Sequence, residues 1–141
     1  MKMRVLPVLL LNLVILAASA NIAFGQAMES DYLVGRWTPD GEAGCSDPNS
    51  AFMDLNDQGI IQTSRLGQVE SVGFWELEDD LLYFHLLALP SFFTDRIQKP
   101  TDQLGYYKIR ILPFNVEENE FDAAFSFEDF LKRAELSRCE S

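Results

Sequence analysis

The only histidine of the chain, His85, is the first residue that could take part in catalysis. Acyl-transfer chemistry needs a histidine beside a nucleophile, with a third group that orients the ring. His85 instead lies in the apolar run 81–87 (LLYFHLL), and the sequence contains no Gly-x-Ser-x-Gly turn. We therefore expect a structural or surface histidine and a protein without a catalytic role. A small hydrolase that depends on His85 is the minority alternative.

A second candidate for chemistry is a calcium-loop pattern, in which Asp54, Asn56 and Gln58 alternate before Gly59. The twelfth position of such a loop requires a bidentate glutamate, but here it is the cation Arg65. One histidine and two cysteines are too few for a His/Cys zinc site. The sequence also lacks a glycine-rich phosphate-binding loop. We therefore predict that this segment is a turn and that the protein uses no metal or cofactor.

The first 27 residues have the three parts of a secretory signal peptide. Lys2 and Arg4 form a basic start, residues 5–18 form an uncharged apolar run, and small residues follow it. Cleavage is expected after Ala20 or Ala27, and the protein is expected to be periplasmic or secreted. The apolar run is shorter than the roughly 20 residues of a spanning helix, so a signal anchor is the less favoured alternative. No later run is long enough to hold the mature protein in a membrane.

The remaining residues, 28–141, are expected to form a single β-rich domain. The 11 basic residues of the chain, less Lys2 and Arg4, leave nine against 22 acidic residues, a net charge of −13. Nucleic acids bind basic patches and anionic lipid repels negative charge, so this acidity argues against both partners. Self-repulsion that keeps the protein in solution explains the charge, and a basic partner is the alternative.

Cys45 and Cys139 are the only cysteines, and the signal peptide directs them to an oxidising compartment. Two cysteines in that setting predict a disulfide. The bond would close a loop of nearly the whole mature domain, for which chain entropy predicts a stabilisation of about 4 to 5 kcal/mol. Two separate free thiols are the alternative, and the spacing does not match a Cys-x-x-Cys redox motif.

Hydrophobic residues mostly alternate with polar ones in short runs, which is typical of strands with one buried face. Tight turns separate most of these runs. The pattern predicts an all-β fold, a small antiparallel up-and-down barrel of about eight strands, because closure removes exposed sheet edges. A two-sheet sandwich is the main rival. The expected strands are residues 33–37, 51–55, 60–65, 69–78, 81–87, 104–114, 121–127 and 130–139.

The connection between the fifth and sixth expected strands is long, and long loops in compact domains are often functional. Phe92, Phe93 and Ile97 have helical spacing, so a short helix over 91–98 is expected. Arg96 adds positive charge to an acidic protein. These four side chains are the predicted site for a ligand or partner. The segment is either a lid with aromatic anchors or a passive cover over the open barrel end.

The tripeptide Gly35-Arg36-Trp37 lies on the first expected strand, near the mature N-terminus. A Gly-x-Trp at the head of an eight-stranded meander resembles the lipocalin-like (calycin) group of barrels. The resemblance implies that Trp37 packs across the closed end of the barrel, with Gly35 as its close-packed neighbour. Trp75, which shares one face of the fourth expected strand with Gly73, is a further structural residue.

The chain is also similar to small bacterial periplasmic barrels that inhibit secreted proteases, which have a comparable size, a signal peptide and one disulfide. Such inhibitors insert an N-terminal tail into a protease cleft, so residues 28–32 are a second binding candidate. The resemblance implies a periplasmic or secreted lipocalin-like binding protein that takes a small apolar ligand or a protein at the barrel mouth. An inhibitor or interaction module that acts on a secreted or host enzyme is the alternative.

Overall fold

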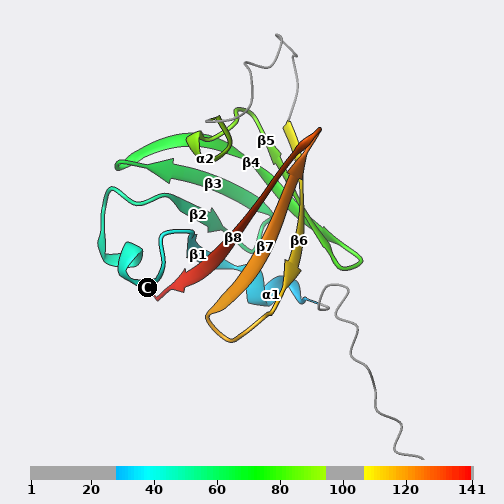
Figure 1. Cartoon of the computed structure of the whole chain (residues 1–141), viewed down its shortest axis with the longest axis horizontal. Coiled ribbons are helices and arrows are strands. Elements are labelled where there is room, and N and C mark those ends of the chain that lie inside the picture. The colour runs from blue at the N-terminus through cyan, green and yellow to red at the C-terminus, as the bar shows by residue number, and fades with distance from the viewer. Residues whose placement is uncertain (1–27, 95–106, 141) are drawn as a thin grey trace, which may run out of the picture.

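The computed structural model describes residues 28–94 and 107–140, which form a closed barrel of eight antiparallel strands (Figure 1). Each strand pairs with the next along the chain, and the last pairs with the first. The expected fold class is confirmed, and the sandwich is excluded. The strands are β1 (Gly35–Thr38), β2 (Phe52–Leu55), β3 (Ile60–Arg65), β4 (Gln68–Glu78), β5 (Leu81–Leu86), β6 (Tyr107–Phe114), β7 (Glu120–Phe127) and β8 (Phe130–Cys139).

Three short helical segments accompany the strands: α1 (Ser30–Leu33), the 3-10 helix η1 (Glu42–Ser46) and α2 (Ser91–Thr94). The first strand begins two residues later than expected because α1 takes the chain up to Leu33. η1 lies in the turn-rich connection between β1 and β2. α2 begins where the helix over 91–98 was expected; residues 95–98 lie outside the described residues, as does the expected signal peptide over 1–27.

The segment that imitates a calcium loop is the turn between β2 and β3. The side-chain oxygen Oδ1 of Asn56 accepts the backbone N–H groups of Gln58, at 3.0 Å, and of Ile60, at 2.8 Å. Gly59 takes a φ of 79°, in the left-handed region that glycine adopts without steric cost. Asn56 therefore satisfies the donors of this turn itself, as asparagine commonly does in turns.

The barrel has two different ends (Figure 1). α1 lies at one end, together with the β2–β3, β4–β5 and β6–β7 turns. α2 lies at the other end, together with the β3–β4 and β7–β8 turns; the β1–β2 connection leaves from this end and folds back along the barrel, so that η1 lies beside the end of β8. We call these the closed end and the open end.

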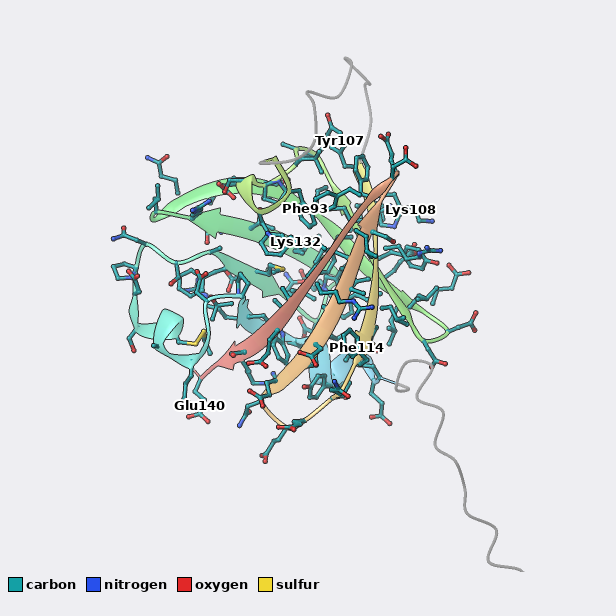
Figure 2. All side chains as sticks on the ribbon, viewed as in Figure 1. Phe93, Tyr107, Lys108, Phe114, Lys132 and Glu140 are labelled. Atoms are coloured by element: carbon teal, nitrogen blue, oxygen red, sulfur yellow. A yellow bond between two sulfur atoms is a disulfide. The ribbon has the colours of Figure 1, made fainter. Side chains whose placement is uncertain are left out.

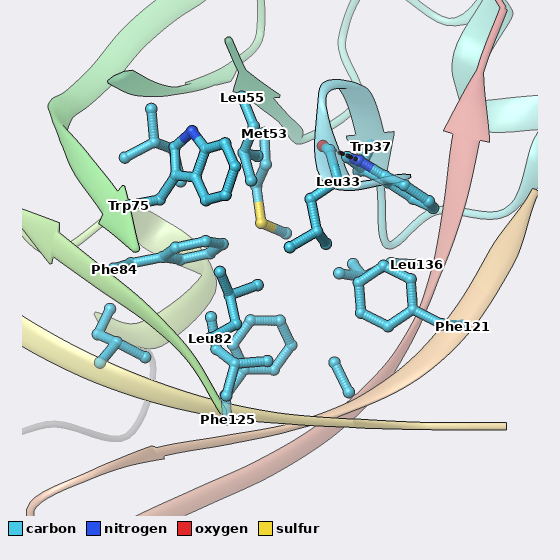
Figure 3. Packing of buried hydrophobic residues seen from close by; sticks show 14 of the residues in the cluster. Leu33, Trp37, Met53, Leu55, Trp75, Leu82, Phe84, Phe121, Phe125 and Leu136 are labelled. Carbon is cyan, nitrogen blue, oxygen red and sulfur yellow. Dashed lines mark hydrogen bonds between the residues drawn. The ribbon is translucent and has the colours of Figure 1, made fainter. Parts of the chain in front are cut away.

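Side chains from every strand fill the interior of the barrel (Figure 3). Barrels of about eight strands have an interior just wide enough for their own side chains to occupy. On β7 the apolar positions that alternate with polar ones in the sequence are also the buried positions, since Phe121, Ala123 and Phe125 are buried. The buried apolar residues on the strands include Trp37, Met53, Leu55, Ile61, Trp75, Leu82, Phe84, Leu86, Ile109, Ile111, Phe121, Ala123, Phe125 and Leu136.

Gly73 of β4 marks a close approach of two backbones. A Cβ atom at Gly73 would lie 1.8 Å from the carbonyl oxygen of His85 on β5. Gly73→Ala is therefore expected to lower the free energy of unfolding by about 3 kcal/mol, measured by urea denaturation. Gly67→Ala, in the β3–β4 turn, is the control, because a Cβ there meets nothing within 4 Å and costs only backbone strain of about 1 kcal/mol. Equal losses in the two variants would contradict the close approach.

Candidate functional site

The closed end of the barrel is built around Trp37, which is 1% exposed. Its indole Nε1 donates to the carbonyl oxygen of Leu33, the last residue of α1, at 2.9 Å. The ring of Phe121 packs edge-on against the indole with centroids 4.9 Å apart. The guanidinium of Arg138 lies over the indole, 4.4 Å from its centroid. Trp37, on β1, therefore contacts α1, β7 and β8 at the same time.

Arg138 also fastens the N-terminal residues to the barrel. Its Nη1 donates to the carbonyl oxygen of Val34 at 3.0 Å, and its Nη2 donates to that of Tyr32. Gly35, with a φ of 138°, leaves room for this side chain, because a Cβ there would lie 3.2 Å from Nη1. The close neighbour of Gly35 is therefore the guanidinium group that covers Trp37.

The N-terminal residues that resemble an inhibitor tail pack onto this end. Met28 is 7% exposed, and the Tyr32 hydroxyl donates to the carbonyl oxygens of Glu117 and Glu120. Burial raises the pKa of Tyr32; Arg138 opposes that shift, and the two glutamates add to it. The phenol therefore stays protonated and keeps donating at neutral pH. Residues 28–32 are part of the wall of the closed end.

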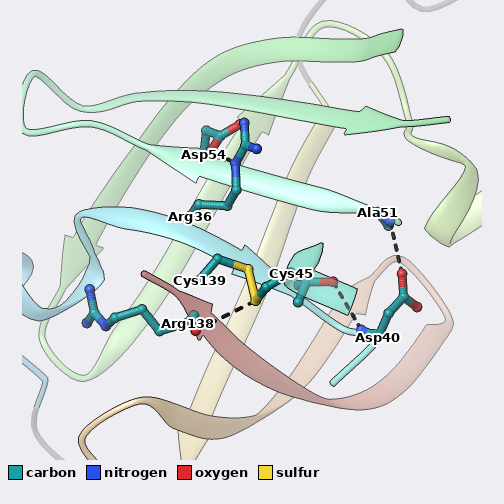
Figure 4. The surroundings of a disulfide bond; sticks show 8 residues. Arg36, Asp40, Cys45, Ala51, Asp54, Arg138 and Cys139 are labelled. Carbon is teal, nitrogen blue, oxygen red and sulfur yellow. Dashed lines mark hydrogen bonds and ion pairs between the residues drawn. A yellow bond between two sulfur atoms is a disulfide. The ribbon is translucent and has the colours of Figure 1, made fainter. Parts of the chain in front are cut away.

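Cys45 and Cys139 form a disulfide, with an S–S distance of 2.07 Å and Cα atoms 5.3 Å apart (Figure 4). The predicted bond is confirmed, and two free thiols are excluded. The bond joins η1 to the last residue of β8. The disulfide therefore holds the middle of the β1–β2 connection against the barrel.

A groove of about 670 Å³ opens at the open end between β8, the β1–β2 connection and α2. It exists because β1 ends at Thr38, where the chain turns away, whereas β8 extends back to Phe130. β1 consequently pairs with β8 only at Ser137, Arg138 and Cys139. The groove is lined by Pro39, Asp40, Ala43, Gly44, Asp47, Asn49, Ser50, Ala51, Arg65, Ser91, Phe92, Lys132, Arg133, Ala134 and Glu135.

Two cations of the groove have only neutral partners. Lys132 Nζ donates to the Phe92 carbonyl oxygen at 3.1 Å and lies 3.7 Å from the centroid of the Phe92 ring. Arg65 Nη1 donates to the Ser91 hydroxyl at 3.1 Å. Within 28–94 and 107–140, neither cation has a carboxylate within 4.0 Å. The groove lining also includes the carboxylates of Asp40, Asp47 and Glu135, so an anionic group would be favoured only directly beside Lys132 or Arg65.

The wall opposite β8 is held in place by local contacts (Figure 4). The Asp40 carboxylate accepts the Ala51 N–H at 2.9 Å, and the Thr38 hydroxyl accepts the Asp40 N–H at 3.2 Å. Gly44 packs against this corner, because a Cβ there would lie 2.8 Å from the Asp40 Cβ. Together with the Cys45 disulfide, these contacts fix the shape of the wall before any ligand binds.

The predicted binding residues divide between the groove, the interior and the residues that are not described. Phe92 lines the groove, and Phe93 is buried beside it, with its ring centroid 5.7 Å from that of Phe125. Figure 2 shows Phe93 and Lys132 on the side of the barrel next to α2. Arg96 and Ile97 lie outside the described residues. The structural residues Gly35, Trp37 and Trp75 lie away from the groove, and the Trp75 indole donates to the carbonyl oxygen of Asn56 at 3.1 Å.

The sequence interpretation missed Lys132, Arg65 and Asp40 as groove residues. Lys132 had a detectable signal, because it shares a strand face with Ala134 and Leu136 and so places a cation on an inward face. Arg65 and Asp40 had no such signal. Arg65 lies at the end of β3, and Asp40 lies in a connection whose path depends on where β1 ends.

His85 lies on the outer face of the barrel, away from the groove. Its ring stacks on Phe74 with centroids 4.3 Å apart, and its Nε2 lies 2.9 Å from the Glu76 carboxylate. Among the described side chains, no group of three or more His, Cys, Asp or Glu gathers as metal ligands would. In the same part of the chain, no helix has the length and apolar character needed to cross a bilayer.

Comparisons with protein-family models, with curated proteins and with solved structures found no match to this chain. The class is defined by the fold and the site: a small, disulfide-linked, eight-stranded antiparallel barrel with a filled interior and a groove beside β8.

Proposed function

We propose that this protein is an exported, lipocalin-like binding protein with no catalytic role, and that it binds its ligand in the groove at the open end. The observation that carries the proposal is a groove of about 670 Å³ that brings the Phe92 ring together with two cations that have neutral partners, on a barrel whose interior is filled by its own side chains. Cavities of roughly 300–1,000 Å³ are the usual size of ligand sites in proteins.

Three further features support this proposal. The groove residues lie on connections and strand ends that a rigid barrel positions, which is where binding residues concentrate. The Cys45–Cys139 bond fits a periplasmic or extracellular location, since disulfides persist in oxidising compartments. A buried tryptophan, Trp37, closes the end opposite the groove, which is the arrangement that the lipocalin-like resemblance implies.

The chemistry of the groove suggests the kind of ligand. A wholly apolar ligand would need room inside the barrel, and side chains such as Phe84, Ile109 and Phe125 occupy that interior. The groove instead combines the Phe92 ring with charged side chains and main-chain groups. We infer that the ligand has polar or charged groups as well as an apolar contact.

Ala43→Trp tests the proposal by filling the groove. Ala43 lines the groove from η1 and is exposed, so the larger side chain does not disturb the core. The mature protein, purified from its own source, is expected to carry bound mass in native mass spectrometry. Ala43→Trp is expected to lower the occupied fraction about tenfold, since each 1.4 kcal/mol of lost binding is a factor of ten.

Val69→Trp is the matched control, because Val69 is 57% exposed on β4 and does not line the groove. This variant is expected to keep the bound mass of the wild-type protein. Equal occupancy in the Ala43 and Val69 variants would reject the groove as the site. Bound mass of a second protein that survives Ala43→Trp would support an inhibitor that uses another surface.

A further inference from the structure

β8 has an uncovered edge beside the groove. β8 pairs with β7 along residues 130–137, but with β1 only at Ser137, Arg138 and Cys139. Among the residues that the structure describes, no strand covers the other side of 130–136. Four of these residues, 132–135, line the groove. An edge of this kind is a ready template for another strand.

The main-chain groups along this edge belong to Leu131, Arg133 and Glu135. The N–H of Arg138 donates to the carbonyl oxygen of Asn119, at 2.7 Å, and therefore points toward β7. Successive residues of an antiparallel strand direct their N–H and C=O groups to opposite sides. The even-numbered residues of β8 thus bond to β7, whereas the odd-numbered ones turn toward β1 or, beyond its end, toward the groove.

The opposite wall of the groove does not offer a matching edge. In the β1–β2 register Trp37 faces Met53. If β1 continued past Thr38, its next residue, Pro39, would face Ala51. The Ala51 N–H is instead taken by the Asp40 carboxylate, at 2.9 Å. A chain that entered the groove would therefore find its main-chain partners on β8.

We propose that the groove binds an extended peptide segment of a partner protein, which adds a strand along Leu131–Glu135 and places an acidic side chain beside Lys132. The inference rests on the proposed function, because both use the same groove. Five residues of strand span about 16 Å. In this mode of recognition, main-chain hydrogen bonds supply the affinity and side-chain contacts supply the specificity.

The direct contacts of Lys132, rather than the groove as a whole, indicate the chemistry of the segment at one position, because Asp40, Asp47 and Glu135 balance the other cations of the lining. Lys132 is on the inward face of β8, and the partners of its ammonium group are a carbonyl oxygen and an aromatic ring. Arg65 Nη1 similarly bonds to a hydroxyl. Side chains directly opposite on neighbouring strands lie about 4.5–5.5 Å apart, so an inward carboxylate on an added strand reaches Lys132. A charge-assisted hydrogen bond of this kind is roughly twice as strong as a neutral one.

The test uses a phage-displayed library of random linear heptapeptides, selected on the mature, disulfide-bonded protein. Enriched peptides are expected to contain strand-forming residues with an Asp or Glu, and to bind as synthetic peptides. Lys132→Gln is expected to weaken the binding of these peptides about tenfold. Replacing the acidic residue of the peptide with its amide is expected to weaken binding to the wild-type protein equally. The amide peptide is expected to lose no further affinity for Lys132→Gln, because the two groups are partners.

Arg133→Pro and Arg133→Ala form a matched pair for the edge itself. Both remove the same charged side chain, but only proline removes the N–H that faces the groove. Proline is tolerated at edge positions whose N–H lies outside the ladder, so the pairing of β8 with β7 is expected to survive. Arg133→Pro is expected to bind the peptides at least about tenfold more weakly than Arg133→Ala, which serves as the reference because it lacks the same side chain.

A second measurement covers the case in which Arg133→Pro fails to fold. Wild-type protein is titrated with a selected peptide that is N-methylated at successive positions. Alternate methyl groups are expected to abolish binding, with the intervening ones tolerated, because only every second amide pairs with β8. Uniform sensitivity along the peptide, or none, would overturn the added strand.

Other outcomes separate this inference from the proposed function. A selection without enriched peptides, or equal peptide binding by Arg133→Pro and Arg133→Ala, would overturn the peptide inference. If Ala43→Trp then still removed the mass bound in the natural source, the groove would remain the site of a different ligand. A doubled protein mass that is lost in Arg133→Pro would identify a second copy of this chain as the occupant, and would also overturn the inference.

Discussion

Removing the disulfide with Cys45→Ala and Cys139→Ala is expected to lower the free energy of unfolding by about 4 to 5 kcal/mol. The bond joins residues 94 positions apart, so it restricts almost the whole unfolded domain. Natural domains have a total stability of roughly 5–15 kcal/mol, so this loss removes a large part of it. Urea denaturation of the oxidised protein and of the double variant measures the difference.

Reduction of the wild-type protein is the control for this prediction, because it breaks the same bond without changing the sequence. Reduced wild-type protein and the double variant are expected to unfold at the same urea concentration. A loss below about 1 kcal/mol would mean that the barrel contacts alone hold η1 against β8. The disulfide would then not be needed to hold the wall of the groove in place.

Replacing Trp37 with alanine is expected to cost about 3–5 kcal/mol, as for other large side chains removed from a core. The substitution removes the hydrogen bond to the Leu33 carbonyl and leaves a cavity between Phe121 and the guanidinium of Arg138. Urea denaturation gives the loss of stability. Amide hydrogen exchange is expected to show lost protection in residues 30–38 at the closed end.

Trp37→Phe separates the volume of the side chain from its hydrogen bond. Phenylalanine fills most of the space but cannot donate to Leu33, so the expected cost is about 1–2 kcal/mol. The two variants are therefore expected to differ by about 1–4 kcal/mol. A cost below about 1 kcal/mol for Trp37→Ala would show that Trp37 is not the residue that closes the barrel.

Much of the fold could be predicted because the information is local. Period-two alternation marks β7 directly, since Phe121 and Phe125 point inward and Asp122 does not. A turn such as the one that Asn56 organises separates consecutive strands and leaves them antiparallel. The disulfide could be predicted from the expected signal peptide and the presence of only two cysteines.

The groove could not be predicted because its cause is not local. It depends on β1 ending at Thr38 while its neighbour β8 continues to Phe130, and the register that pairs these strands is a tertiary property. The short helices α1 and η1 were also missed, since a single turn carries no hydrophobic periodicity. The aromatic pair Phe92-Phe93 lies at the end of the barrel where the groove opens, but its charged partner Lys132 comes from the last strand.

Amide hydrogen exchange most directly tests whether the groove is the binding site. The protein as isolated from its own source is compared with the same protein after denaturation, removal of bound material and refolding with the disulfide intact. The account predicts that the isolated form is more protected in three places only: residues 131–135, residues 39–51 and residues 91–92 around the groove. Equal exchange throughout, or added protection confined to the outer face around Phe74 and His85, would contradict it.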